Sequence, residues 1–263
     1  MSRIRSISSM LAAVALVLPA IAVPARAMAQ TPVESSAETQ FQIDLKVPED
    51  ALKPFLPAGF TSFVATQGPA KDCNLRVVFI DRVTINSPDG KPLGKGSNQL
   101  VYLVAPAKDA AGNSVQLVVG GITEDPANAP GPFGNYLLAT THEMRRTTTA
   151  GASGPILDTQ DWNFTAKSGE HLELHVKYER GNANLRKGAD VKFYSAKEPA
   201  TYQIFHQEMI LDILRNTTTN PPDHVKEFSL KMGGGSFGKL VSNTTPVLSW
   251  DNVLWANRTI SNP

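Results

Sequence analysis

The sequence predicts a mainly β fold, a β-rich α+β chain whose antiparallel sheets form a closed or cone-like barrel with one or two short helices. Three observations predict it. Runs rich in β-branched and aromatic residues recur about every 10 to 15 residues. Glycine, proline, asparagine and aspartate separate these runs, as is typical of turns. Helical spacing of apolar residues is confined to two short segments.

In the amino-terminal half, each predicted element follows from its own pattern. Residues 41–47 alternate apolar and polar side chains, which indicates a strand. Residues 48–59 begin with a proline suited to the first turn of a helix and end in Pro-Ala-Gly, so we expect a short helix. Residues 74–85 are a long β-branched run, typical of a buried strand. Residues 98–105 and 114–121 are predicted strands joined by a polar turn.

The carboxy-terminal half continues the pattern. Residues 161–167 and 170–178 are predicted strands joined by a Ser-Gly hairpin turn. Residues 189–196 form a further strand. Residues 199–216 are ambiguous, because they begin with strand character and end with an apolar helical face. The last two predicted strands are residues 223–232 and 246–259.

The first 29 residues have the composition of an export signal. Two arginines within the first five residues precede an apolar core over residues 10–24, and small residues precede expected cleavage points near Ala27 or Ala29. This apolar core is too short to span a membrane. We therefore expect a periplasmic or secreted protein.

Beyond the signal, residues 30–40 are polar and aperiodic and are expected to form a disordered lead-in, followed by a single barrel domain over residues 41–263. Without the three arginines of the signal, the chain has 22 basic and 24 acidic residues. This near balance gives no support for nucleic-acid binding. No later segment is apolar enough for membrane insertion. A small-molecule ligand or substrate is the expected partner, and a homo-oligomer is compatible with the sequence.

Three motifs have simple structural interpretations. Cys73 is the only cysteine, which excludes an intramolecular disulfide and favours a small buried residue over a catalytic thiol. The "HLELH" run at 171–175 alternates as a strand, where its two histidines lie roughly 13 Å apart, too far for one metal ion. We expect no metal and no cofactor. The "GGSFG" run around Ser236 favours a glycine turn over a nucleophile elbow, because no helix pattern follows it.

The stretch "GPFGNYLLATTHEMRR", residues 131–146, has two interpretations. It is either a loop beside a pocket or a turn followed by exposed charges at a strand end. In the first interpretation, His142 or Glu143 acts as a base, and Arg145 or Arg146 holds a carboxylate.

The triplet His206, Gln207 and Glu208 interrupts an otherwise apolar run. Such a cluster suits the interior of a polar barrel and an exposed strand face equally well. His206 and Glu208 are therefore candidates for a pocket wall, with surface exposure as the open alternative.

The order of several segments resembles the acetoacetate decarboxylase-like superfamily. The segments are "VPEDALKPFLPAGF", "NQLVYLVAPAKDAAGNSVQLVVGG", "EPATYQIFHQEMILDILR" and "SFGKLVSNTTPVLSWDNVLWANRT", which together extend over most of residues 41–260. The resemblance implies a β-rich, cone-like barrel around a buried pocket. It also implies a lysine that forms a Schiff base with a keto acid, in a Gly-(aromatic)-Pro-Lys turn.

The closest match to that turn here is "GPFGNY". The lysine position then falls on Asn135, or on Gly134 if the loop slips by one residue, and an amide cannot form an imine. The resemblance is therefore expected to hold for the scaffold and not for the imine chemistry. Arg76 and Glu143 are candidates for the charges of the family's pocket.

We therefore expect an exported small-molecule-binding barrel, a lyase or hydratase that acts on an oxo-acid or hydrophobic metabolite without a Schiff-base lysine. The alternative is a non-catalytic periplasmic ligand-binding or accessory protein, for which His142, Glu143 and His206 should lie apart or outside. A serine hydrolase using Ser236 is the third hypothesis. The acid–base candidates are His142, Glu143, His206 and Glu208, and the ligand-binding candidates are Asn135, Tyr136, Arg145, Arg146 and Arg76.

Overall fold

The computed structural model describes residues 30–68, 70–131, 134–216, 224–242 and 244–263. The expected export signal, residues 1–29, lies outside the described residues, and so do positions 132–133 of the glycine- and proline-rich stretch. Within the described residues, no helix is both long and apolar enough to cross a membrane.

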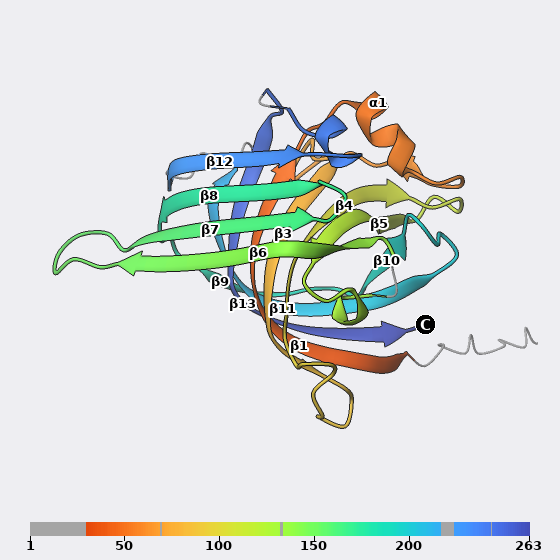
Figure 1. Cartoon of the computed structure of the whole chain (residues 1–263), viewed down its shortest axis with the longest axis horizontal. Coiled ribbons are helices and arrows are strands. Elements are labelled where there is room, and N and C mark those ends of the chain that lie inside the picture. The colour runs from red at the N-terminus through yellow and green to blue at the C-terminus, as the bar shows by residue number, and fades with distance from the viewer. Residues whose placement is uncertain (1–29, 69, 132–133, 217–223, 243) are drawn as a thin grey trace, which may run out of the picture.

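Within the described residues, seven strands close into a barrel (Figure 1). Neighbouring strands are antiparallel except β5 and β10, which are parallel. The closed, mainly β architecture predicted from the sequence is confirmed. In order around the wall, the strands are β5 (Ser114–Thr123), β10 (Val191–Ser195), β11 (Tyr202–Asn216), β13 (Val247–Asn262), β1 (Thr31–Leu45), β3 (Leu75–Asn86) and β4 (Asn98–Lys108).

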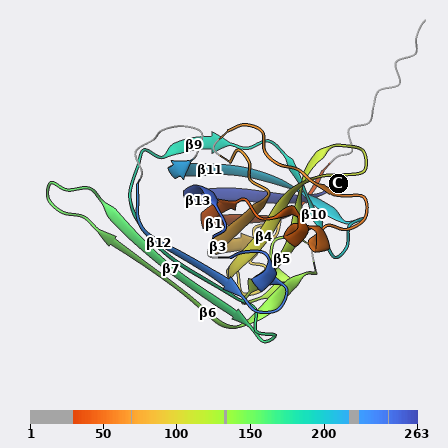
Figure 2. The same ribbon diagram turned by 90° about the horizontal axis from the view of Figure 1, so that it is seen from above.

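A second antiparallel sheet lies against one side of the barrel, and the β6–β7 hairpin projects beyond it (Figure 2). It leaves the barrel where β6 pairs with β5 in parallel over three residues. Its strands are β6 (Tyr136–Thr149), β7 (Leu157–Ala166), β8 (His171–Glu179) and β12 (Val225–Gly233). The remaining elements are short: α1 (Glu49–Leu52), β2 (Thr61–Ser62), β9 (Asn184–Lys187) and the 3-10 turns Lys53–Phe55, Pro126–Asn128 and Phe237–Lys239.

The larger hydrophobic core lies between the barrel wall and this flanking sheet. Alternate residues of β1 and β3 point outward into it. The ring of Phe79 lies 5.8 Å from that of Trp162, and Phe41 lies 6.0 Å from Tyr178. Each fully buried side chain of this size contributes roughly 1.5–3 kcal/mol. This packing fixes the outer face of β1 and β3, so their intervening residues must face the lumen.

Strand β1 begins at Thr31, so the expectation of a disordered lead-in over 30–40 is wrong. The physical reason is the polarity of the lumen. Ser36, Glu38 and Gln40 face inward, where they are buried and hydrogen-bonded to one another. Their polar composition resembles that of a disordered segment, although each residue belongs to the interior.

The ambiguous segment 199–216 forms strand β11 over most of its length and contains no helix in its described part. It pairs with β13 from Ile204 to Asn216. The continuous ladder satisfies its backbone polar groups and outweighs the apolar helical face near its end.

Candidate functional site

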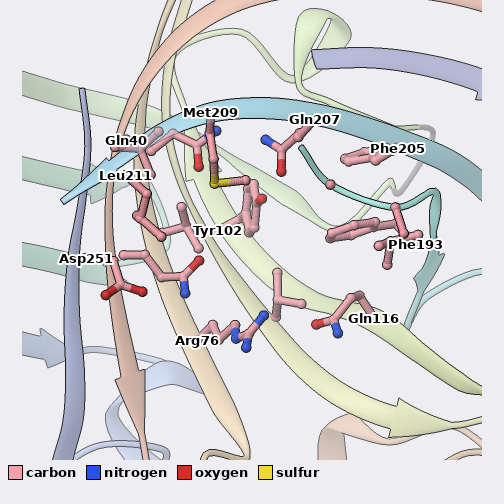
Figure 3. Close-up of a pocket in the computed structure, with 17 residues that line it drawn as sticks. Gln40, Arg76, Tyr102, Gln116, Phe193, Phe205, Gln207, Met209, Leu211 and Asp251 are labelled. Carbon is pink, nitrogen blue, oxygen red and sulfur yellow. The ribbon is translucent and has the colours of Figure 1, made fainter. Parts of the chain in front are cut away.

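The barrel lumen contains a cavity of about 280 Å³ (Figure 3). Its walls come from all seven barrel strands and from the β9–β10 connection. The polar side chains that line it are Gln40, Gln42, Arg76, Gln116, Gln207 and Asp251. The larger apolar ones are Tyr102, Phe193, Phe205, Met209 and Leu211.

One part of the cavity is lined by Arg76 and Asp251, and the buried Asp44 on the strand between theirs pairs with Arg76. Asp44 of β1 directly opposes Arg76 of β3, and Arg76 Nε lies 3.0 Å from Asp44 Oδ1. Asp44 is only 1 % exposed, whereas 28 % of the Arg76 side chain is accessible. Figure 3 shows the Arg76 guanidinium pointing into the cavity. A guanidinium has five donors, so Arg76 keeps donors for an anionic ligand after pairing with Asp44.

Asp251 of β13 is the third charged group, and it is 8 % exposed. It opposes Gln42 across the β1–β13 ladder. Burial raises the pKa of Asp251 to about 7, and the nearby charge of Asp44 adds to the rise. Ser249 Oγ donates to Asp251 Oδ1 at 3.1 Å and, with Arg76, limits the rise. Asp251 can therefore exchange a proton near neutral pH inside a ligand-sized cavity.

The pKa values of Asp44 and Arg76 are both raised. Burial raises the pKa of Asp44, and Arg76 opposes that rise. Burial alone would lower the pKa of Arg76, but Asp44, Cys73 and Asp251 together outweigh burial and the pKa of Arg76 is raised. Arg76 is therefore a permanent cation, and the two carboxyl groups share its charge.

Glutamine amides supply neutral hydrogen-bonding groups along the cavity. Gln116 Oε1 is buried without a hydrogen-bond partner among the described residues, and Figure 3 shows this amide oxygen turned toward the side of Arg76. A buried polar atom without a partner costs about 1–3 kcal/mol. A ligand group that bonds to Gln116 recovers this cost.

The other end of the cavity is aromatic. The rings of Phe193 and Phe205 are stacked, with centroids 4.3 Å apart and an interplanar angle of 18°. Figure 3 shows both rings on the side of the cavity away from Asp251. Met209 also lines the cavity. The cavity therefore joins an apolar end to a charged end.

A buried ion network lies next to the cavity in the lumen. Glu38 accepts from Arg82 at 3.0 Å and pairs with Arg258 at 2.9 Å, and all three side chains are fully buried. Burial would raise the pKa of Glu38, but Arg258 and Arg82 outweigh it and the pKa is lowered. With its amide oxygen facing Arg258, Gln207 accepts from Arg258 at 3.0 and 3.1 Å. The charge of Glu38 is thus satisfied by the protein itself.

Among the residues proposed from the sequence, Arg76 lines the cavity. Asn135 lies outside it, where its Nδ2 donates to the Val118 carbonyl at 2.7 Å. Tyr136 is packed at the lumen core, and its hydroxyl lies 3.3 Å from the Pro130 carbonyl, to which it donates.

The charges of the "THEMRR" run lie on the flanking sheet rather than in the barrel. His142 Nε2 pairs with Glu124 at 2.7 Å. The Arg146 guanidinium stacks over Trp162 at 5.3 Å. Glu143 and Arg145 are exposed on the opposite face of β6 and border a surface hollow.

His206 and Glu208 point away from the lumen on β11. His206 Nδ1 lies 3.0 Å from Asp190, and Glu208 lies 3.7 Å from Lys187. The alternate residues of the same strand, Gln207 among them, line the cavity. The two candidate bases His142 and His206 are therefore not brought together.

The three simple motifs are placed as follows. Cys73 is fully buried, and burial raises the pKa of its thiol to about 12. The "HLELH" run lies in strand β8, where His175 pairs with Asp161 at 2.7 Å. Among the described residues, no group of three or more metal-ligating side chains is found. Ser236 precedes a 3-10 turn that seats Phe237 against Gly120.

Sequence reasoning did not identify Asp251, Gln116 or Gln207. One signal was available for Asp251, an acid between apolar and aromatic residues in "VLSWDNVLW". A lone acid in a strand is unusual if that strand is buried. The glutamines gave no signal of their own, because exposed strands contain them equally often.

No protein-family model matches the chain, and no curated protein sequence matches it. Several solved structures match over most of the chain length, and two of them serve as examples. One is the enduracididine biosynthesis enzyme MppR complexed with pyruvate, with 14 % identity, 95 % of this chain and 96 % of that chain covered, and a TM-score of 0.57. The other is an acetoacetate decarboxylase-like enzyme from Sphingomonas wittichii RW1, with 10 % identity, 88 % and 91 % coverage, and a TM-score of 0.50. The chain therefore has the fold of acetoacetate decarboxylase-like enzymes, as the order of its sequence segments predicted.

Proposed function

We propose that this protein binds a small oxo-acid inside its barrel and acts on it as a lyase or hydratase, by acid–base chemistry and without an imine. The observation that carries the proposal is the presence of Arg76 and Asp251 in one cavity. Structures of MppR contain pyruvate, or a condensation product of pyruvate with imidazole 4-carboxaldehyde. The shared fold makes a ligand of this chemistry a reasonable choice for the lumen.

Arg76 and Asp251 have separate roles in this proposal. The Arg76 guanidinium binds the substrate carboxylate, which competes with Asp44 for its donors. The ionised Asp251 takes a proton from the carbon next to the oxo group, so a C–H bond breaks and an O–H bond forms. The electron pair moves to the oxo oxygen, and an N–H of the Arg76 guanidinium that is not used by Asp44 donates to the resulting enolate. The protonated Asp251 then returns the proton to the product or to a leaving hydroxyl group.

The proposal excludes a Schiff base on two grounds. None of the 17 residues that line the cavity is a lysine. The sequence motif is expected to put Asn135, or Gly134 if the loop slips by one residue, at the position of the family's lysine, and the Asn135 amide donates to a backbone carbonyl. The test is borohydride reduction in the presence of pyruvate or acetoacetate, followed by intact mass measurement. We expect no added mass, and a covalent adduct on any lysine would overturn this part of the proposal.

The non-catalytic alternative also has an observation in its favour. His142, Glu143 and His206 lie on different outer faces, as that alternative requires. Exchange of the α-protons of an oxo-acid in deuterated water separates the two functions. An enzyme of the proposed kind accelerates exchange, and Asp251→Asn abolishes the acceleration. A carrier protein binds the acid and leaves the exchange rate unchanged.

We also propose that the chain is exported, as the composition of residues 1–29 supports. Mass measurement of the protein recovered from the periplasm or medium tests this. We expect a mature chain that begins after Ala27 or Ala29, and a full-length chain in the cytoplasm would refute export.

A further inference from the structure

The inference concerns the class of oxo-acid, and it rests on the proposed function. The cavity has two unlike ends. Arg76, which pairs with Asp44, and Asp251 border one end, and the stacked rings of Phe193 and Phe205 border the other (Figure 3). A ligand that fits both ends is an anion at one terminus and apolar at the other.

We propose that the ligand is a monocarboxylic oxo-acid with an aromatic ring, bound with its carboxylate at Arg76 and its ring against Phe193 and Phe205. The two rings present an apolar aromatic surface, and aromatic ligands pack on such surfaces in offset or edge-to-face geometry. The thioether of Met209 lines the same cavity and offers a polarisable, adaptable contact.

The charges of the cavity argue against a second carboxylate on the ligand. One guanidinium, that of Arg76, faces two buried carboxyl groups, Asp44 and Asp251. The two cations of the neighbouring network already pair with Glu38. A dicarboxylic acid would place its second charge at the aromatic end, where the Arg258 guanidinium, 5.1 Å from the centroid of the Phe205 ring, already pairs with Glu38 and desolvation is costly. A monoanion with an apolar tail avoids that cost.

The size of the cavity limits the tail. Ligand pockets usually measure about 300–1,000 Å³, and this cavity of about 280 Å³ lies just below that range. One ring joined to a three-carbon acid is therefore the expected scale.

The experiment is calorimetric titration of the full chain with four probes at pH 6. We expect phenylpyruvate to bind at least tenfold more tightly than pyruvate and 2-oxoglutarate. Phenylacetone, which lacks the carboxylate, should bind at least tenfold more weakly than phenylpyruvate. Equal affinities for phenylpyruvate and pyruvate would overturn the aromatic part, and equal affinities for phenylpyruvate and phenylacetone would overturn the carboxylate part.

Variants of the two phenylalanines, together with one control, test where the aromatic ring of the ligand binds. Phe193→Leu keeps an apolar side chain of similar size and should reduce the phenylpyruvate-to-pyruvate preference severalfold. Leu185→Ala is the matched control, because Leu185 is 64 % exposed on the outside of the barrel, and it should change neither affinity. A preference that survives Phe193→Leu and Phe205→Leu intact would place the ring elsewhere and refute the assignment.

A titration with 3-phenylpropionate as a fifth probe distinguishes this inference from the proposed function. 3-Phenylpropionate has no oxo group, so its affinity reports recognition of ring and carboxylate without any chemistry. If it binds while α-proton exchange is absent, the inference stands and the catalytic proposal fails. If pyruvate exchanges its protons and phenylpyruvate does not bind, the inference fails and the catalytic proposal stands.

Discussion

Replacing Asp251 with asparagine should remove a specific pH dependence of folding stability. The pKa of Asp251 is raised by burial from 3.8 to about 7. The folded chain therefore binds this proton more tightly than the unfolded chain does. Stability contributed by the protonated group is fully present below about pH 4 and is lost as the pH rises toward 7. Asparagine keeps the shape and stays neutral at every pH.

The size of the effect follows from the shift. One pKa unit corresponds to 1.36 kcal/mol, so the rise from 3.8 to about 7 amounts to about 4 kcal/mol. Only 8 % of Asp251 is exposed, so solvent screening reduces this little. We expect the variant to match the wild type near pH 4 and to exceed its free energy of unfolding by about 4 kcal/mol above pH 8. The asparagine oxygen can still accept from Ser249.

The assay is urea unfolding followed by tryptophan fluorescence at several pH values between 4.5 and 9, with the three tryptophans of the chain as probes. Asp50→Asn is the matched control, because it makes the same chemical change on an exposed helical residue. Its stability difference from wild type should stay nearly constant with pH. A difference between Asp251→Asn and wild type that does not change with pH would refute the reasoning.

Three further predictions concern ligand binding, the buried ion network and Cys73. The ionised Asp251 repels the carboxylate of the ligand, so the Kd of phenylpyruvate should rise up to tenfold per pH unit above about pH 7. Calorimetric titrations should show that Asp251→Asn flattens this pH dependence. Glu38→Gln leaves Arg258 buried without its carboxylate and leaves Arg82 with Glu34 alone, so urea unfolding should show a loss of about 3–5 kcal/mol. Cys73 is fully buried with a thiol pKa of about 12, so a disulfide reagent at pH 8 should modify it only after urea is added; rapid labelling of the folded chain would contradict its burial.

Much of the fold was predictable because most barrel strands bury one face in a large apolar core. The runs at 74–85 and 98–105 became β3 and β4 with nearly the same bounds. Their outward residues pack on the flanking sheet, so their composition is strongly β-branched and apolar. Patterns of this kind depend on local sequence alone, and hence a single sequence reveals them.

The position of the site was less predictable, because both faces of a polar barrel strand look alike. On β11, His206 and Gln207 are adjacent polar residues, and only the ring closure decides which of them enters the lumen. A shift of one residue reverses the two faces. The same uncertainty made the inward polar residues of β1, such as Glu38, resemble a disordered segment.

Glu38 and Asp251 are both buried acids of the lumen. The number of cations around each indicates which of them can take part in chemistry. Glu38 has two arginines, and its pKa is lowered despite complete burial. Asp251 shares the single cation Arg76 with Asp44, and its pKa is raised to about 7. Both acids lie in the same barrel, so burial is common to them and the number of compensating charges differs. A fully compensated carboxylate holds strands together and has nothing left to exchange. A carboxylate with too few neighbouring cations binds a proton or pairs with a new partner at neutral pH. Acid–base chemistry on a bound anion requires this property.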